Sequence, residues 1–443
     1  MLLLVVSACG PSGRGDDEGG GGVDAPYSGP TGTLRGRVWA PGLAPGMTTV
    51  GEEVPVAGAA VYTTSVRPPP IPAGAYCEPC QAAPAGAVIT DHLGSFVVPD
   101  AQPGKRWLVI QKGQFRLEQE LDITTTDLTL DTAQTTLPSV MDQANGKWIP
   151  RIAIAAGSYD PLESILGKMG IGSVDASGSY SATNGELDLV DNGGATLGAT
   201  MTMDQLVRDP AKLASYHMVI IPCSGDQFTS ALQDQQVLKN IRDYVKAGGK
   251  LYVTDWSGEW MDNVFPQQVQ LGEGGFGGFG GSIDTPASAY ATISDSWNSS
   301  QFGTADGDAY DSPDADAVDP GLASWLGAQS GPSPSSTATS SINSHHFETV
   351  DNWNYIQQLN PVQVGDNNGT PVIDTPKAWV TGSGGTGGRH ALTVTFEPAG
   401  CGRVMFSTYH TTPGAHVGLY PQERILLYLL MEIGVCSDNP VIL

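Results

Sequence analysis

Between residues 148 and 265, short apolar runs alternate with amphipathic segments, and this alternation constrains the fold more than any other feature of the chain. Residues 149–157 and 217–223 are mostly apolar over the length of one strand, as is typical of strands buried on both faces. Residues 235–247 repeat apolar side chains at helical spacing and end at two consecutive glycines. Strands that alternate with helices in this way predict a parallel sheet with helices on both faces.

The preceding residues, 31–135, show a different pattern. Short segments such as 32–39 and 89–99 alternate between apolar and polar side chains and are separated by Gly, Asp and Pro. Short strands at close spacing, without a helical period, predict a small β-sandwich. We therefore expect a multidomain fold, with an all-β sandwich at 31–135 and an α/β domain at 148–436 that carries a long loop-rich insertion at about 267–375.

Three segments of the first domain share a pattern with a known family. They are Gly-x-Leu-x-Gly-Arg-Val at 32–38, Pro-Val-Ala-Gly-Ala-x-Val at 55–61 and Thr-Asp-x-x-Gly-x-Phe at 90–96. The domain resembles the carboxypeptidase regulatory-like domain, and the resemblance implies a transthyretin-like sandwich that serves as a spacer or adhesion module. A proline-rich insertion from Ser65 to Gly86 departs from the compact loop of that family.

The second domain also carries a resemblance. Its relevant segments are the strand that ends in Ile220-Ile221-Pro222, the helix that ends in residues 246–250, and residues 401–410. Over residues 148–265 and 376–436 the chain resembles the flavodoxin-like class I glutamine amidotransferase fold, including its trehalose-utilisation-like relatives. The resemblance implies a flavodoxin-like parallel sheet.

The residues that carry amidotransferase chemistry are missing. The family has a cysteine nucleophile in a sharp turn after the strand that here ends at Asp255, but this chain continues with Trp256 and Ser257. The family's His and Glu usually stand two positions apart, whereas His410 is followed by two threonines. We therefore expect no amidotransferase activity and no cofactor.

Another nucleophile remains as an alternative. Cys223 ends a strand at the carboxyl side of the sheet, where open α/β sheets carry their sites. A hydrolase would use Cys223 or Ser257 with His410 as the base, near Asp255. The interpretation that we favour takes Cys223 as an inert buried thiol, because cysteines of this kind are common in cores.

The amino terminus predicts the location of the protein. Residues 1–9 are mostly apolar and close on Val6-Ser7-Ala8-Cys9, which resembles the lipobox of a bacterial lipoprotein signal peptide, although no basic segment precedes it. The resemblance implies cleavage before Cys9 and attachment of lipid to that residue. Residues 10–30 are Gly-rich and predict a flexible linker. We expect a lipid-anchored protein of the cell envelope, at the outer membrane or facing the periplasm.

The charge balance restricts the partners. Asp and Glu number 46 against 21 Lys and Arg, which gives a formal net charge of −25. This balance argues against nucleic-acid binding and against electrostatic docking on anionic lipid. The sequence thus predicts a non-catalytic envelope lipoprotein that displays a degenerate amidotransferase-like domain for a protein or carbohydrate partner.

The chain has six cysteines. With Cys9 assigned to lipid, we expect disulfides between Cys77 and Cys80 and between Cys401 and Cys436, which leaves Cys223 as a free core thiol. The Cys77-Glu-Pro-Cys80 motif lies in a proline-rich loop without further ligands nearby in the sequence. This position favours a local disulfide in an oxidising envelope over a zinc or redox site.

The insertion contains two further patterns. Its acidic run at 306–316 offers Asp306, Asp308 and Asp311 as weak calcium candidates, but it lacks the glutamate at position twelve of an EF-hand loop. We expect a solvated acidic loop instead. The pair His345-His346 is interpreted as surface side chains and not as metal ligands. No metal site is predicted.

Overall fold

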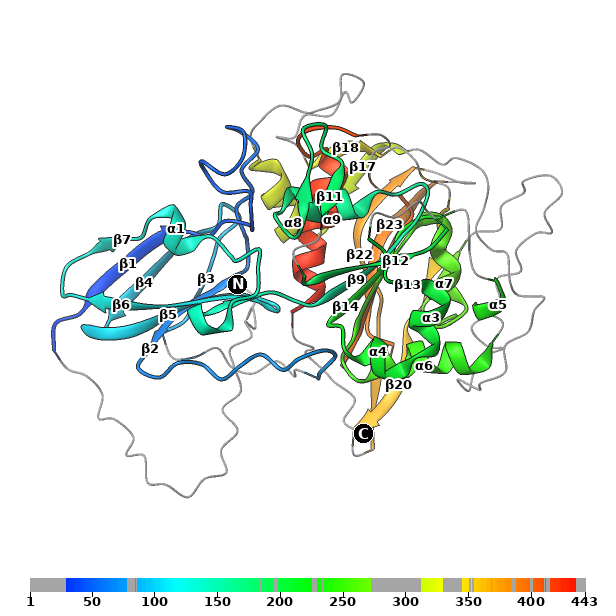
Figure 1. The fold of residues 1–443 in the computed structure, drawn as a ribbon, viewed down its shortest axis with the longest axis horizontal. Coiled ribbons are helices and arrows are strands. Elements are labelled where there is room, and N and C mark those ends of the chain that lie inside the picture. Colours follow the sequence, from blue (N-terminus) through cyan, green and yellow to red (C-terminus); the bar gives the residue numbers. More distant parts are fainter. Residues whose placement is uncertain are drawn as a thin grey trace.

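The computed structural model describes residues 29–77, 84, 86–182, 185–193, 198–224, 229–232, 234–271, 312–329, 345–349, 352, 354–367, 369–383, 388–398, 401–409, 411 and 415–435. They form a β-rich first module and a second module built around one large sheet, side by side in Figure 1. The prediction of a β-rich multidomain chain is confirmed.

The first module has two sheets whose inner faces share one core. The three-stranded sheet has the order β4-β1-β7 and the five-stranded sheet the order β3-β2-β5-β6-β8. Leu34 and Phe96 of the first sheet belong to the same buried cluster as Val61 and Ile110 of the second. Its elements are β1 (Gly32–Arg37), β2 (Ala60–Thr64), β3 (Val88–Ile89), β4 (Ser95–Ala101), β5 (Gly104–Lys112), β6 (Phe115–Ile123), β7 (Leu128–Thr129), α1 (Thr132–Thr135), the 3₁₀ helix η1 (Gln143–Asn145) and β8 (Lys147–Trp148).

The second module is organised by a ten-stranded sheet of order β13-β12-β9-β14-β15-β24-β23-β22-β17-β18. The strands from β13 to β24 run parallel, and those from β24 to β18 pair antiparallel. The strands of this sheet are β9 (Ile152–Ala156), β12 (Leu187–Asp191), β13 (Met201–Thr202), β14 (Met218–Ile221), β15 (Lys250–Thr254), β17 (Ser312–Ala317), β18 (His346–Thr349), β22 (Lys377–Ser383), β23 (Arg389–Phe396) and β24 (Arg403–Ser407).

Three two-stranded pairs accompany this sheet. They are β10 (Ser173–Val174) with β11 (Tyr180–Ala182), β16 (Val269–Leu271) with β19 (Ile356–Leu359), and β20 (Val362–Asn367) with β21 (Thr370–Asp374).

Alternate residues of the parallel strands face two different layers. In β9, Ile152 and Ile154 join the cluster that also contains the first module, whereas Ala153 and Ala155 join a second cluster on the opposite face. The first face is covered by α2 (Leu162–Lys168), α8 (Pro320–Gly327) and α9 (Pro421–Ile433). The opposite face is covered by α3 (Met203–Arg208), α4 (Pro210–Ala214), α5 (Thr229–Leu232), α6 (Gln235–Lys246) and α7 (Glu259–Asp262).

The strongest local patterns of the sequence are reproduced. The helix predicted at 235–247 is α6, and Asp234 caps it by accepting a hydrogen bond from the backbone of Gln236. Residues 420–435 are mostly apolar and contain α9, which is buried along nearly its whole length. No helix in the described ranges is long and apolar enough to cross a membrane.

The insertion differs from the expected run of loops. Its described part supplies β17 and β18 to one end of the large sheet, as well as β19 to β21. The acidic segment ends in a strand because Ser312, Ala315 and Ala317 are small and buried, while Asp314 and Asp316 remain more accessible. The calcium candidates Asp306, Asp308 and Asp311 lie outside the described residues.

The two predicted disulfides are wrong, because the structure joins Cys77 to Cys401. Their Cα atoms are 5.1 Å apart, although 324 positions separate them in the sequence. The proline-rich insertion of the first module passes His217, which precedes β14, and Cys77 then lies beside Cys401, two positions before β24. The prediction that Cys223 is a free, buried thiol is confirmed. Cys9, Cys80 and Cys436 lie outside the described residues.

Candidate functional site

Four neighbouring parallel strands bring polar side chains to one edge of the sheet. Asp160 follows β9, Cys223 follows β14, Asp255 directly follows β15, and Thr411 follows β24. All four are buried. Because the strands are parallel, these residues meet at the carboxyl edge, where open α/β sheets carry their ligand sites.

Asp160 is the centre of this group. It is fully buried, and its Oδ2 accepts a hydrogen bond of 2.6 Å from Oγ1 of Thr254. Its Oδ1 accepts bonds from the backbone N and Oγ1 of Thr411, at 3.1 and 2.5 Å. A buried carboxylate is tolerated when hydrogen bonds of this kind replace water. Asp160 therefore connects the loops after β9, β15 and β24.

Cys223 is not arranged as a nucleophile. Its side chain is buried, and its backbone N donates a 2.9 Å bond to Oγ1 of Thr254. Burial raises the pKa of the Cys223 thiol well above its ordinary value, and the nearby negative charge of Asp255 raises it further. Since the thiolate is the reactive form, both effects oppose nucleophilic attack.

A sharp turn follows β15 and contains two buried polar side chains. Asp255 has a φ of +46°, in the left-handed region that non-glycine residues rarely adopt, and it is fully buried in the 3₁₀ helix η2 (Asp255–Gly258). The Oγ of Ser257 is also buried and donates a 2.7 Å bond to the carbonyl of Pro222. His410 lies outside the described residues, so its pairing with Cys223 or Ser257 stays a prediction.

An aromatic pair flanks these buried groups. The rings of Tyr159 and Trp256 are stacked, with centroids 6.1 Å apart and an angle of 29° between their planes. They come from the loops after β9 and β15 and directly neighbour Asp160 and Asp255 in the chain. Tyr159 is 48% exposed, which is unusual for so large a ring. The edge thus presents an aromatic surface to solvent beside buried polar groups.

A cavity of about 180 Å³ lies next to this edge. Pro161, Ser164 and Lys168 line it on one side, and Thr411, His416 and Glu423 line it on the other. Because Thr411 also bonds Asp160, the cavity adjoins the polar group at the strand ends.

The cavity contains a chain of three titratable side chains. Nζ of Lys168 lies 3.1 Å from Nε2 of His416, and this histidine nitrogen lies 3.0 Å from Oε2 of Glu423. Burial lowers the pKa of Lys168. In the first turn of α2, burial raises the pKa of Glu163 to about 7. The wall thus offers hydrogen-bond donors and acceptors to a polar ligand.

Sequence reasoning missed this cavity. Lys168 and His416 are 248 positions apart, and no motif connects them. The only signal was the presence of Glu423 within the apolar run at 420–435, since a charged side chain in a buried helix needs a partner.

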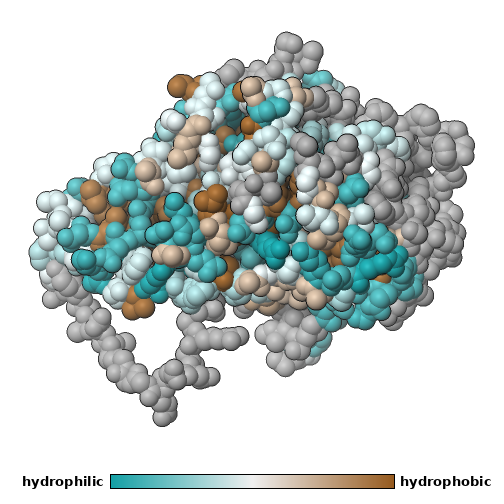
Figure 2. Space-filling model, in the orientation of Figure 1, coloured by the Kyte–Doolittle hydropathy of each residue, from teal (hydrophilic) through white to brown (hydrophobic). Residues whose placement is uncertain are grey.

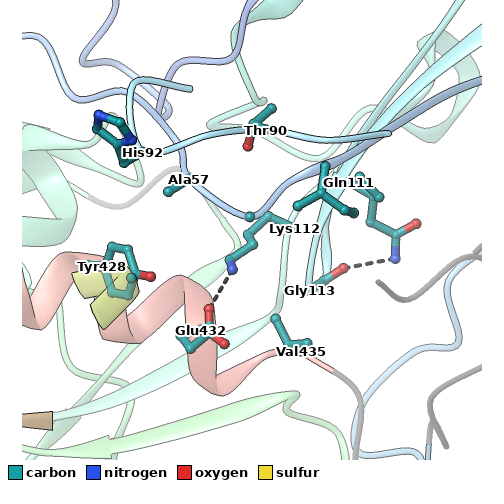
Figure 3. Close-up of a pocket in the computed structure, with 13 residues that line it drawn as sticks. Ala57, Thr90, His92, Gln111, Lys112, Gly113, Tyr428, Glu432 and Val435 are labelled. Carbon is teal, nitrogen blue, oxygen red and sulfur yellow. Dashed lines mark hydrogen bonds and ion pairs between the residues drawn. The ribbon is translucent and has the colours of Figure 1, made fainter. Parts of the chain in front are cut away.

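A larger cavity, of about 290 Å³, lies between the two modules (Figure 3). Ala57, Thr90 and His92 of the first module line it together with Tyr428 of α9. Lys112 and Glu432 form an ion pair at its wall, and both side chains are largely buried. The ion pair of Lys112 and Glu432 therefore joins the two modules.

Comparisons of the chain with protein-family models, with curated proteins and with solved structures return no match.

Proposed function

We propose that this chain is a non-catalytic lipoprotein of the cell envelope that binds carbohydrate at the carboxyl edge of its parallel sheet. The α/β module would be a degenerate relative of the amidotransferase-like fold. Supporting this, the strands β12-β9-β14-β15-β24 have the spatial order 2-1-3-4-5 when numbered along the chain, which is the flavodoxin-like order. The two-residue edge strand β13 extends this order to 3-2-1-4-5-6, which is the other common order of doubly wound sheets.

The observation that carries the binding proposal is the stacked pair of Tyr159 and Trp256. An exposed aromatic face offers apolar contact area for the C–H-bearing face of a sugar ring. The adjoining cavity supplies Ser164, Lys168 and His416, which can bond sugar hydroxyls. This mixture of an apolar platform and several polar groups suits a neutral, polyhydroxylated ligand better than a strongly charged one.

The surroundings of Cys223 and Ser257 argue against catalysis. A nucleophilic site needs an accessible nucleophile, a base within hydrogen-bond reach and a group that orients the base. Cys223 is buried next to a carboxylate that disfavours its thiolate, and Ser257 donates its hydroxyl proton to a backbone carbonyl. Both cavities described above are lined by other side chains.

The lipid anchor rests on the residues before the first module. The Val6-Ser7-Ala8-Cys9 segment and the Gly-rich residues 10–30 would attach the protein to the outer membrane and separate it from the surface. The first module would act as a spacer. Replacing Cys9 by Ser should abolish labelling with a radiolabelled fatty acid, and unchanged labelling would refute the anchor.

Turnover assays separate this proposal from the hydrolase alternative. Purified protein is incubated with glutamine, simple esters and soluble peptidoglycan fragments, and we expect no turnover. Activity that disappears in both Cys223→Ala and His410→Ala would establish the hydrolase instead. Activity that neither substitution changes would indicate a contaminant.

A further inference from the structure

At the antiparallel end of the large sheet, three potential metal ligands converge. We propose that Asp316 of β17, together with His345 and His346 at the start of β18, binds a divalent transition-metal ion, for which Zn²⁺ is the best match. The site is separate from the carboxyl edge and does not depend on the function proposed there.

The sheet itself places these residues together. Asp316 and His346 are directly paired across the antiparallel β17 and β18, and the backbone N of Ala317 donates a 3.0 Å bond to the carbonyl of His345. One potential ligand atom from each of the three side chains lies within 4.8 Å of the other two. Small rotations of exposed side chains bring such atoms to the spacing of a metal's coordination shell.

The two imidazoles point the same way. Consecutive residues of a strand ordinarily project to opposite faces. The rings of His345 and His346 instead lie side by side, with centroids 4.1 Å apart and 37° between their planes. Both residues are exposed, as the sequence predicted, but their shared orientation gives a chelating pair that the sequence did not predict.

The carboxylate of Asp316 is held in position for this role. Its Oδ2 accepts a 2.6 Å bond from Nη2 of Arg389. Its Oδ1 contacts Nδ1 of His346, is shielded from solvent, and accepts no hydrogen bond of good geometry among the described residues. One oxygen is thus oriented by the guanidinium, as is usual for a ligand's outer contacts, and the other faces the imidazoles.

Neighbouring Asp314 provides a contrast. Its Oδ1 accepts bonds from the backbone N and Oγ of Ser383, at 2.8 and 2.6 Å, and its Oδ2 accepts one of 2.9 Å from Arg389. Both of its oxygens are therefore used within the protein. Asp314 supports Arg389, while Asp316 remains available as the ligand.

The ligand set selects the class of metal. Imidazole nitrogen suits Zn²⁺ and its transition-metal neighbours, whereas Ca²⁺ and Mg²⁺ prefer oxygen ligands. Two imidazoles and one carboxylate leave a further position of a tetrahedral ion open to water or to a partner's side chain. The site would therefore be an accessible three-ligand site.

The test is a Zn²⁺ titration of the full chain, prepared without a polyhistidine tag, by calorimetry and by competition with a chromophoric chelator. We expect one equivalent to bind. His345→Ala, His346→Ala and Asp316→Asn should each weaken binding at least about tenfold. The control is His92→Ala, which removes an exposed imidazole elsewhere and should bind as the unmodified chain does.

Cobalt provides a second readout. Co²⁺ bound at the site should show visible d–d bands that His346→Ala removes and His92→Ala retains. Because both histidines are exposed, their replacement should leave the circular dichroism spectrum unchanged. Absence of Zn²⁺ binding by the unmodified chain, or an affinity in both histidine variants equal to that of the unmodified chain, would overturn the proposal.

Discussion

The amino and carboxyl edges of the parallel sheet are built differently. At the amino edge, the insertion of the first module lies against the strand starts, and its path toward α4 is visible in Figure 1. Nε2 of His217 lies 2.8 Å from the carbonyl of Pro72, and Nζ of Lys250 donates a 3.0 Å bond to the carbonyl of Cys401. The disulfide between Cys77 and Cys401 fixes this contact covalently.

At the carboxyl edge, the polar groups are satisfied from within the α/β module, and an aromatic pair remains partly open to solvent. On the face shown in Figure 2, hydrophilic and hydrophobic residues are mixed across both modules. The amino edge therefore contributes to stability, whereas the exposed groups of the carboxyl edge are accessible to ligands. Changes at the amino edge should reduce stability and spare binding, and changes to exposed groups at the carboxyl edge should do the reverse.

The largest effect is expected from the disulfide. Cys77→Ser opens a loop of more than 300 residues, and the chain-entropy model assigns such a loop about 6 kcal/mol of the free energy of unfolding. Urea denaturation measures this loss. The unmodified chain in reductant should match the variant, and the variant should be insensitive to reductant. Equal stability of variant and unmodified chain under oxidising conditions would contradict the amino-edge assignment.

The second effect tests whether buried polar groups at the carboxyl edge are structural. Asp160→Ala removes the acceptor of two threonine side chains and one backbone N–H, and should cost about 3 kcal/mol of unfolding free energy. Asp160→Asn retains one carbonyl acceptor and should cost less. Chemical denaturation measures both. An alanine variant as stable as the unmodified chain would show that Asp160 is not the centre of the edge.

The third effect is a pH dependence at α2. Burial raises the folded pKa of Glu163 to about 7, from an ordinary value of 4.5. Between these values the unfolded chain ionises while the folded chain holds its proton, so this group lowers stability as the pH rises, by about 3 kcal/mol in total. Glu163→Gln should therefore be more stable than the unmodified chain at pH 8 and equally stable at pH 4.

The control for this dependence is Glu120→Gln, at an exposed position of β6. Its unfolding free energy should follow that of the unmodified chain at both pH values. If Glu163→Gln showed the same pH profile as Glu120→Gln, the carboxyl group of Glu163 would not be buried in solution.

The sequence predicted the features that depend on neighbours in the chain. The buried strands at 149–157 and 217–223 and the helix at 235–247 are all readable from local pattern. The burial of Cys223 as a free thiol was also predicted.

Features that join distant segments were not predicted. Cys77 has a nearby cysteine in sequence but is bonded to one 324 positions away, because the insertion passes the start of β14 and reaches the segment before β24. Lys168 and His416 meet only after β24 returns to the sheet beside β15. Local spacing contains no information about such crossings, and the opposed His346 and Asp316 depend on the same kind of non-local pairing.

The smallest expected change in stability is at Tyr159. Because its ring is half exposed, Tyr159→Ala should alter the unfolding free energy by less than about 0.5 kcal/mol. Tyr159→Phe keeps the stacked ring and should be neutral. A larger loss in Tyr159→Ala would mean that the pair with Trp256 supports the fold and is not a binding surface.

We propose that the carboxyl edge binds carbohydrate without catalysis. Calorimetric titration of Tyr159 variants with soluble peptidoglycan fragments tests this directly. We expect the unmodified chain and Tyr159→Phe to bind, and Tyr159→Ala to lose about 1–2 kcal/mol of binding free energy. The fragments should be intact after the titration. Equal affinity of Tyr159→Ala and Tyr159→Phe, or no binding by the unmodified chain, would contradict it.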